Sequence, residues 1–228
     1  MDAIMKHYYN DLQHWFNYPD IFLEAIQNAK DGDHFVEIGV WKGGSAAFMG
    51  VEIFNSGKKL RYDAIDCFAP TKEFGKVTED IYEETKANLK PLTDLGVVNL
   101  IKSHSLDIVG TYEDESLSLC FIDGSHEYED VKADLIAWLP KVKKGGVLAG
   151  HDYDNTNHKG VRMAADEVLG RENIIEKGGC YYYKKWKYSE LNWRIWNGNF
   201  SFKIKIDKIA QEVHNAIFIN LLLEFLAE

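Results

Sequence analysis

The amino-acid sequence predicts an α/β domain in which a doubly wound, mostly parallel sheet carries helices on both faces. Two observations lead to this fold class. Short apolar runs alternate with segments whose apolar residues recur at helical spacing, and glycine or polar residues directly follow each apolar run. Such alternation, with strands that are apolar along nearly their whole length, is typical of a parallel sheet covered on both faces.

The expected elements follow one another along the first 170 residues. Strands are expected at residues 34–38, 61–65, 97–101, 117–122 and 146–149, and helices at residues 45–55, 77–89, 128–139 and 161–169. In the third helix, Val131, Leu135 and Trp138 form one apolar stripe, as an amphipathic helix requires. The pattern therefore predicts a helix between most consecutive strands.

A domain boundary is expected near residue 185. Residues 1–185 would form the α/β domain with an N-terminal helical cap, and residues 186–228 an aromatic-rich C-terminal extension. Residues 209–226 have the pattern of a helix that is apolar on most of its faces, and such a helix must be buried. It would dock on its own domain or pair with a second copy in a homodimer, and we favour the homodimer.

Composition excludes several classes of protein. The chain has 228 residues and a formal net charge of -10, which argues against nucleic-acid binding because that binding needs clustered Lys and Arg. Cys67, Cys120 and Cys180 are far apart, so we expect no disulfide framework and a reducing cytoplasm. No apolar stretch is long enough to span a bilayer. We therefore expect a cytoplasmic protein that binds neither membranes nor nucleic acids.

Residues capable of binding or catalysis follow all five expected strands. They are residues 39–45, Asp66, residues 103–105, residues 123–126 and residues 151–152. In doubly wound sheets, ligands bind outside the carboxyl ends of the strands. The sequence therefore predicts one site at this edge of the sheet. The segments 68–78 and 154–160 flank it, either as lids and substrate contacts or as plain exposed connections.

Residues 35–45 have the pattern of a strand, a glycine turn and the start of a helix. Gly39, Gly43 and Gly44 let the backbone approach a ligand, and the helix that contains Ser45 offers free N–H groups to a carboxylate. The glycine spacing differs from the G-x-G-x-x-G of dinucleotide enzymes. Glu37 suits a ligand that carries a cation, such as the ammonium of a methionine moiety. The alternative is a tight turn beside a surface acid.

Acidic and histidine side chains at the other strand ends suggest further roles. Asp66 could accept both hydroxyls of a ribose, or simply cap a loop. Asp123 and His126 could orient a base, because an imidazole takes a proton near neutral pH. Together with Asp123, His151 and Asp152 would make an open site for Mg²⁺, Mn²⁺ or a transition metal, or would only hydrogen-bond between loops.

Three strings resemble class I S-adenosylmethionine (SAM)-dependent methyltransferases. They are FVEIGVWKGGS at residues 35–45, IDGSHEY at 122–128 and GGVLAGHDY at 145–153. The chain is most similar to the group that holds macrocin-type sugar O-methyltransferases and cephalosporin hydroxylase-like proteins, over residues 33–183. The resemblance implies a Rossmann-like class I methyltransferase fold, SAM as the cofactor, and O-methylation of a small molecule, a sugar or a nucleotide sugar.

The resemblance also implies roles for the cofactor-binding residues. Glu37, Gly39 and Gly43 would line the methionine end of SAM, with Gly44 and Ser45 completing the turn. Asp66 would bind the ribose, and His104 and Ser105 would lie near the adenine.

The resemblance places catalysis and metal binding at the two later motifs. Asp123 would serve the cofactor, the catalytic step and, with Asp152, a divalent metal. His126 matches the general base of sugar methyltransferases. Relatives often carry a carboxylate where His151 stands, which argues against magnesium and leaves a softer metal or no metal open.

Three rival functions stay open on the sequence. One is a nicotinamide-dependent oxidoreductase, which the glycine spacing disfavours. Another is a metal-dependent hydroxylase of the same fold, which iron content and oxygen consumption would reveal. The third is a SAM-binding protein without catalysis, against which the intact acid, glycine and histidine positions argue.

Overall fold

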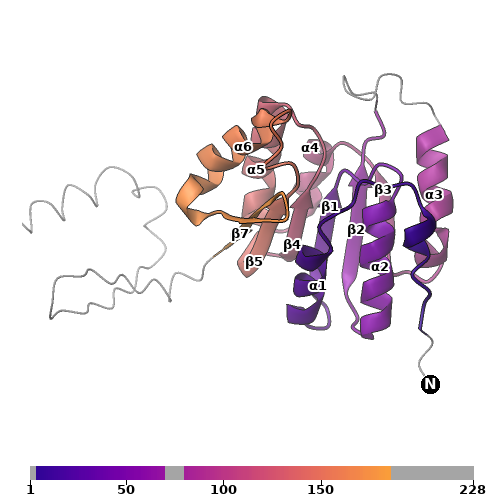
Figure 1. Cartoon of the computed structure of the whole chain (residues 1–228). Coiled ribbons are helices and arrows are strands. Elements are labelled where there is room, and N and C mark those ends of the chain that lie inside the picture. The colour runs from indigo at the N-terminus through magenta and orange to yellow at the C-terminus, as the bar shows by residue number, and fades with distance from the viewer. Residues whose placement is uncertain (1–3, 70–79, 186–228) are drawn as a thin grey trace, which may run out of the picture. The chain divides into compact units, whose positions relative to one another are not determined.

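The computed structural model describes residues 4–69 and 80–185, which contain one seven-stranded sheet of order β3-β2-β1-β4-β5-β7-β6 (Figure 1). The strands are β1 (His34–Ile38), β2 (Arg61–Asp66), β3 (Asn99–Lys102), β4 (Leu117–Ile122), β5 (Val142–Gly150), β6 (Ile175–Lys177) and β7 (Cys180–Lys184). The first five strands pair in parallel, and β7 lies antiparallel to both β5 and β6. The predicted doubly wound, mostly parallel sheet is confirmed.

The four helices predicted by residue range fall close to their expected positions, and the structure adds a short helix after β3 that was not predicted. The helices are α1 (Pro19–Asn28), α2 (Gly44–Ser56), α3 (Asp80–Thr93), α4 (Ser105–Ile108), α5 (Tyr128–Trp138) and α6 (Lys159–Ala165). The helical chain continues past α6 as a wider turn over Asp166–Gly170. The predicted extension 186–228 with its helix at 209–226, residues 70–78 of the flanking loop and the first residues of the predicted helix 77–89 lie outside the described residues.

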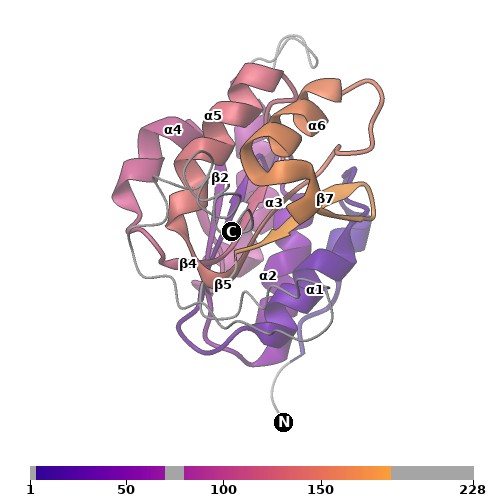
Figure 2. The same ribbon diagram turned by 90° about the vertical axis from the view of Figure 1, so that its left-hand side faces the viewer.

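Two apolar layers cover the two faces of the sheet, because successive strand residues point to opposite sides. On one face Phe35 and Phe121 pack with α1, α2 and α3. On the other face Val36 and Ile122 pack with α5 and α6. Figure 2 shows α1 and α2 on one side of the sheet and α4 and α5 on the other. None of the helices in the described residues is long and apolar enough to cross a membrane.

The structure extends the predicted sheet by two strands at the β5 edge. β7 pairs along β5, with Tyr181 opposite Gly150 and Lys184 opposite Val147, and β6 covers β7. β5 itself begins at Val142, four residues before the predicted strand, and its first residues pair with the start of β4. The β6–β7 hairpin holds the carboxyl end of β5, where two of the predicted site residues follow.

Candidate functional site

Most of the predicted site residues lie at the carboxyl ends of β1 and β4, the adjacent strands at which the strand order reverses. β1 continues to β2 and β3 on one side of the sheet, and β4 continues to β5 on the other, so the crevice above β1 and β4 is the switch point of the sheet. The backbone keeps both strand ends in register: Gly39 N–H donates to the Ile65 carbonyl over 2.8 Å, and Asp123 N–H donates to the Ile38 carbonyl over 2.7 Å.

The glycine turn at the end of β1 has no room for side chains at its first position. Gly39 has φ of +84°, and a Cβ there would lie 2.5 Å from the carbonyl carbon of Asp123 and 2.8 Å from the Cα of Gly124. Only glycine permits both this backbone angle and this approach of the two strand ends. Gly43, at φ of +81°, precedes α2. The turn thus brings its backbone into contact with that of Asp123.

Glu37 and Ser45 are both buried and form a hydrogen bond with each other. Glu37 is 1% exposed, and its carboxylate accepts hydrogen bonds from the hydroxyls of Ser45 and Tyr62. Burial raises the pKa of Glu37 to about 8, although the two hydroxyl donors oppose that rise. No basic side chain of the described residues pairs with Glu37. The carboxyl is therefore largely neutral at pH 7 and has no cation partner within the described chain.

Asp66 organises the glycine turn through backbone contacts. Its Oδ2 accepts the N–H groups of Val40 and Trp41, both over 2.9 Å, and its Oδ1 accepts the N–H of Phe68 over 2.7 Å. Burial raises the pKa of Asp66, and the three backbone donors act against that shift. The predicted capping role is present in the structure, while a ribose would add its hydroxyls to a carboxylate that already has three donors.

The residues predicted to lie near an adenine sit farther along the same edge. His104 is exposed and directly precedes α4, and the Ser105 hydroxyl donates to the carboxylate of Asp134. Both residues follow β3, which is separated from β4 by β2 and β1. The structure therefore keeps them away from the histidine and carboxylate cluster described next.

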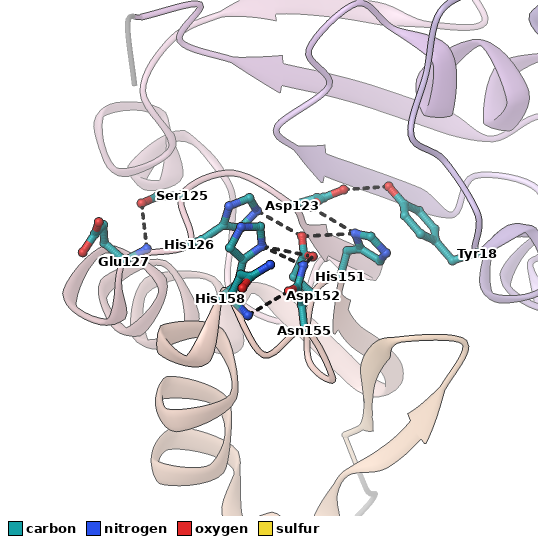
Figure 3. Close-up of polar contacts among 10 residues, drawn as sticks. Tyr18, Asp123, Ser125, His126, Glu127, His151, Asp152, Asn155 and His158 are labelled. Carbon is teal, nitrogen blue, oxygen red and sulfur yellow. Dashed lines mark hydrogen bonds and ion pairs between the residues drawn. The ribbon is translucent and has the colours of Figure 1, made fainter. Parts of the chain in front are cut away.

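Three imidazoles surround the carboxylate of Asp152 (Figure 3). Asp152 Oδ2 lies 3.1 Å from His126 Nε2 and 3.2 Å from His151 Nδ1, and Asp152 Oδ1 lies 3.1 Å from His158 Nδ1. His151 Nδ1 is also 3.9 Å from Asp123 Oδ1. The structure thus brings together the four predicted residues that follow β4 and β5, and adds His158 from the segment before α6.

The electrostatics of this cluster centre on Asp152. Burial alone would raise the pKa of Asp152, but hydrogen bonds from His126, His151 and Asn155 hold it well below its usual range. Burial would lower the pKa of His151, yet the neighbouring Asp152 and Asp123 carboxylates raise it overall. The pKa of Asp123 is raised by burial, against the opposing effect of His151. Asp152 is therefore the fixed negative charge of the site.

The predicted metal residues have geometry suited to a divalent ion. One ligand atom each from Asp123, His151 and Asp152 lies within 4.8 Å of the others. Two carboxylate oxygens and one imidazole nitrogen fit Mn²⁺, Fe²⁺, Co²⁺ or Zn²⁺ better than Mg²⁺, which prefers oxygen ligands alone. These side chains could therefore hold an ion at the carboxyl ends of β4 and β5.

The N-terminal segment supplies site residues that sequence reasoning missed. The Tyr18 hydroxyl donates to Asp123 Oδ2 over 2.8 Å, and its ring centroid lies 4.8 Å from that of His151. Trp15 stacks on Trp41 of the glycine turn with ring centroids 4.2 Å apart. A Cβ on Gly44 would lie 3.1 Å from Cγ of His14. This segment precedes the first strand, and no sequence motif marks its contacts.

A cavity of about 10 Å³, close to the size of one water molecule, lies inside the cluster. It is lined by Asp123, Ser125, His126, His151 and Tyr181, among others. The buried Tyr181 hydroxyl has no hydrogen-bond partner among the described residues. A second hollow of about 550 Å³ lies between α3 and β3 and contains none of the predicted site residues.

The chain is similar to known proteins in both its sequence and its structure. Residues 36–153, more than half of the chain, match the family described as Methyltransferase domain. A curated relative, the uncharacterized protein y4gI of Sinorhizobium fredii (strain NBRC 101917 / NGR234), is 30% identical over 95 residues. That alignment covers 42% of this chain and 10% of y4gI, so the chain corresponds to a small part of that protein.

Solved structures share the fold. The O-methyltransferase NovP superposes with a TM-score of 0.59 and 21% identity, over 74% of this chain and 79% of NovP. CalS11, a TDP-rhamnose 3'-O-methyltransferase of calicheamicin biosynthesis, superposes with a TM-score of 0.54 and 20% identity, over 73% of this chain and 76% of CalS11. At these identities the likeness establishes the arrangement of strands and helices.

Proposed function

Because the chain belongs to the methyltransferase-domain family, we propose that it transfers the methyl group of SAM to a hydroxyl of a small molecule, with a sugar as the favoured acceptor class. The observation that carries this proposal is the juxtaposition, across the switch point, of the Gly39 turn and the cluster around Asp152. The first is the glycine turn that the proposal assigns to the nucleoside ligand, and the second provides a base at the neighbouring strand ends. The sugar acceptor is supported by the structural likeness to CalS11.

SAM, when bound, supplies an electrophilic methyl group on a sulfonium centre. The chain's own residues then align the acceptor oxygen and remove its proton. His126 is the proposed base, because its Nε2 is 3.1 Å from a carboxylate that stays ionised. A proton held on Nε2 and donated to Asp152 puts the basic lone pair on Nδ1, as in other histidine–aspartate pairs. Asp152 orients the ring and stabilises the imidazolium that forms.

A divalent metal, when bound, would hold and acidify the acceptor hydroxyl. Asp123, His151 and Asp152 are the residues proposed to bind it. Tyr18 is a positioning residue for this set, because its hydroxyl fixes Asp123 Oδ2 and its ring packs on His151. The protein's contribution is to hold these three side chains at neighbouring strand ends.

Replacing His126 with alanine tests the base. We expect kcat to fall by about 100- to 10,000-fold, the usual contribution of a positioned general base, while SAM affinity changes by less than about threefold. Turnover is measured as S-adenosylhomocysteine release with a panel of nucleotide-linked deoxysugars, and affinity by calorimetry. His7→Gln changes a half-exposed histidine that pairs with Glu52 far from the cluster and serves as the matched control. Full turnover by H126A would remove His126 from the base role.

The proposed contact between Glu37 and the ammonium of SAM predicts a pH-dependent affinity. A carboxyl whose pKa is about 8 is about 1% ionised at pH 6 and about half ionised at pH 8, and a cation binds the ionised form. Because the α-ammonium of SAM, with a pKa of about 7.8, loses part of its charge by pH 8, SAM should bind about 20-fold more tightly at pH 8 than at pH 6, with release of a proton from Glu37 at pH 6. Calorimetry in buffers of different ionisation enthalpy measures both quantities. Glu37→Gln should bind weakly with a flat pH profile. A flat profile for the unmodified protein would place the ammonium away from Glu37.

A further inference from the structure

The carboxylate of Asp152 has a second set of potential ligands on the side away from Asp123. One ligand atom each from His126, Asp152 and His158 lies within 4.8 Å of the other two. We propose that His126, Asp152 and His158 form a binding site for one first-row transition-metal dication, of the class of Zn²⁺, Co²⁺ and Fe²⁺. This site goes beyond methyl transfer, and binding at it requires neither SAM nor an acceptor.

Three separate segments place the ligands. His126 follows β4, Asp152 follows β5, and His158 directly precedes α6. The segment that carries His158 can approach the segment that carries His126 because Gly160 has no side chain. A Cβ on Gly160 would lie 2.6 Å from the backbone nitrogen of Tyr128. Asp152 itself has φ of +58°, an unusual angle for a residue other than glycine. The backbone is thus arranged to bring all three side chains to one point.

Asn155 fixes the orientation of two of these ligands. Its Nδ2 donates to Asp152 Oδ1 over 2.7 Å and lies 3.1 Å from His158 Nδ1. The N–H of Asn157 donates to Asn155 Oδ1 over 3.0 Å, which sets the direction of the amide. The bond to Asp152 is an outer-sphere contact of the kind that orients metal ligands, whereas the amide contact to His158 would have to be given up if Nδ1 bound the ion. Figure 3 shows Asn155 beside Asp152 and His158.

The donor set selects the class of ion. Two imidazole nitrogens and one carboxylate oxygen suit borderline transition metals, whereas Mg²⁺ and Ca²⁺ prefer oxygen ligands alone. The set differs from Asp123, His151 and Asp152 in having two nitrogens in place of one. The two sets share Asp152, and His158 is the ligand that distinguishes the proposed site.

Ion binding must change the ring geometry. The rings of His126 and His158 are stacked, with centroids 3.8 Å apart and 11° between their planes. Two lone pairs in parallel planes cannot both point at one ion, so each ring has to rotate until its nitrogen faces the metal. A crystal structure with Zn²⁺ should therefore show a wider angle between the rings than the metal-free protein.

Cobalt provides the test, because Co²⁺ bound by nitrogen and oxygen ligands absorbs visible light. Titration of the full chain should give one Co²⁺ per protein, unaffected by millimolar Mg²⁺. His158→Gln should weaken Co²⁺ binding by about 100-fold or more, and Asn155→Ala, which removes only an outer-sphere contact, by about 10-fold. The two sets share Asp152, and we expect Co²⁺ to prefer the one with two imidazole nitrogens over the one with a single nitrogen. His151→Gln and Asp123→Asn, which remove ligands of the other set, should therefore each change the affinity by less than about threefold.

The opposite ranking of these variants would assign the ion to Asp123, His151 and Asp152 and overturn the proposal, as would the absence of Co²⁺ binding at 1 mM. Thermal unfolding and SAM affinity of each variant identify any variant that fails to fold. If H158Q fails, the Asn155→Ala variant decides the result.

An activity measurement adds a consequence that rests on the proposed function. An ion bound to His126 Nε2, the nitrogen beside Asp152, leaves the proton of the neutral ring on Nδ1. The ring then has no free nitrogen with which to accept a proton from the acceptor hydroxyl. Zn²⁺ should therefore inhibit methyl transfer in the unmodified protein, and H158Q should lose this inhibition relative to its own uninhibited rate. If methyl transfer is never detected, the Co²⁺ titration still tests the site.

Discussion

Replacing Asp152 with asparagine is expected to lower kcat by about 1,000-fold while SAM affinity changes by less than about threefold. The carboxylate accepts from imidazoles on two sides, and an amide can accept on only one of them. Its NH₂ group would then face a histidine nitrogen, so His126 would lose both its orientation and the charge that stabilises its protonated form. Histidine–aspartate pairs in other enzymes lose rate by a comparable factor when the acid becomes an amide.

Single-turnover kinetics separates this loss from a loss of binding. Asp154→Asn serves as the matched control, because Asp154 is an exposed acid two residues away and carries the same change in charge. Its kcat should stay within about twofold of the unmodified protein. A D152N protein with less than a tenfold loss would show that Asp152 does not position the base.

The second large effect is expected at Gly39. An alanine Cβ there would overlap the Asp123 carbonyl group, so the ends of β1 and β4 would have to separate. We expect G39A to lose SAM affinity by about 100-fold or more and to lose about 3 kcal/mol of stability, the sum of left-handed backbone strain and overpacking. For a chain of this size the melting temperature should fall by about 10 °C.

A Gly32→Ala variant separates the effect of backbone strain from the effect of overpacking. Gly32 has φ of +87°, almost the angle of Gly39, but a Cβ on Gly32 would have no heavy atom within 4 Å. G32A should therefore cost only the backbone strain, about 1 kcal/mol, and should keep SAM affinity. Equal losses in G39A and G32A would mean that the approach of β1 and β4 is not what the glycine serves. Thermal unfolding and calorimetry measure both variants side by side.

The sequence was enough to predict the parallel part of the sheet, because most of those strands are buried and have apolar runs. β3, whose residues are exposed or half-buried, was predicted at residues 97–101 and lies at Asn99–Lys102. β1 and β4 were predicted with the bounds that the structure has. β6 was missed because Ile175 and Glu176 are both exposed, so its three residues show neither an apolar run nor alternation. Pairing with β7, rather than local preference, makes this segment a strand.

The site was predicted in part. Asp123, His126, His151 and Asp152 come together as expected, since parallel strands end at one edge. His158 lies in a segment that was recognised only as flanking the site, because nothing local to residues 154–160 indicates which strand end its side chain meets.

Some residues that the sequence assigns to ligand binding form hydrogen bonds within the protein instead. The Ser45 hydroxyl donates to Glu37, and the carboxylate of Asp66 accepts three backbone N–H groups. Such bonds depend on how the folded chain brings these groups together, which the spacing of residues in the sequence does not show. The cofactor roles of these residues stay predictions, which the Glu37→Gln experiment begins to test.

The N-terminal segment has a kinetic consequence. His14 lies against Gly44, Trp15 against Trp41, and Tyr18 against Asp123, so one short stretch of chain spans the crevice from the glycine turn to the carboxylates. A nucleoside bound between those groups, as proposed, would require this stretch to move before it could enter or leave. The opening of this segment, rather than the strength of the nucleoside's own contacts, would then set how long the nucleoside stays bound. It would also limit the steady-state rate.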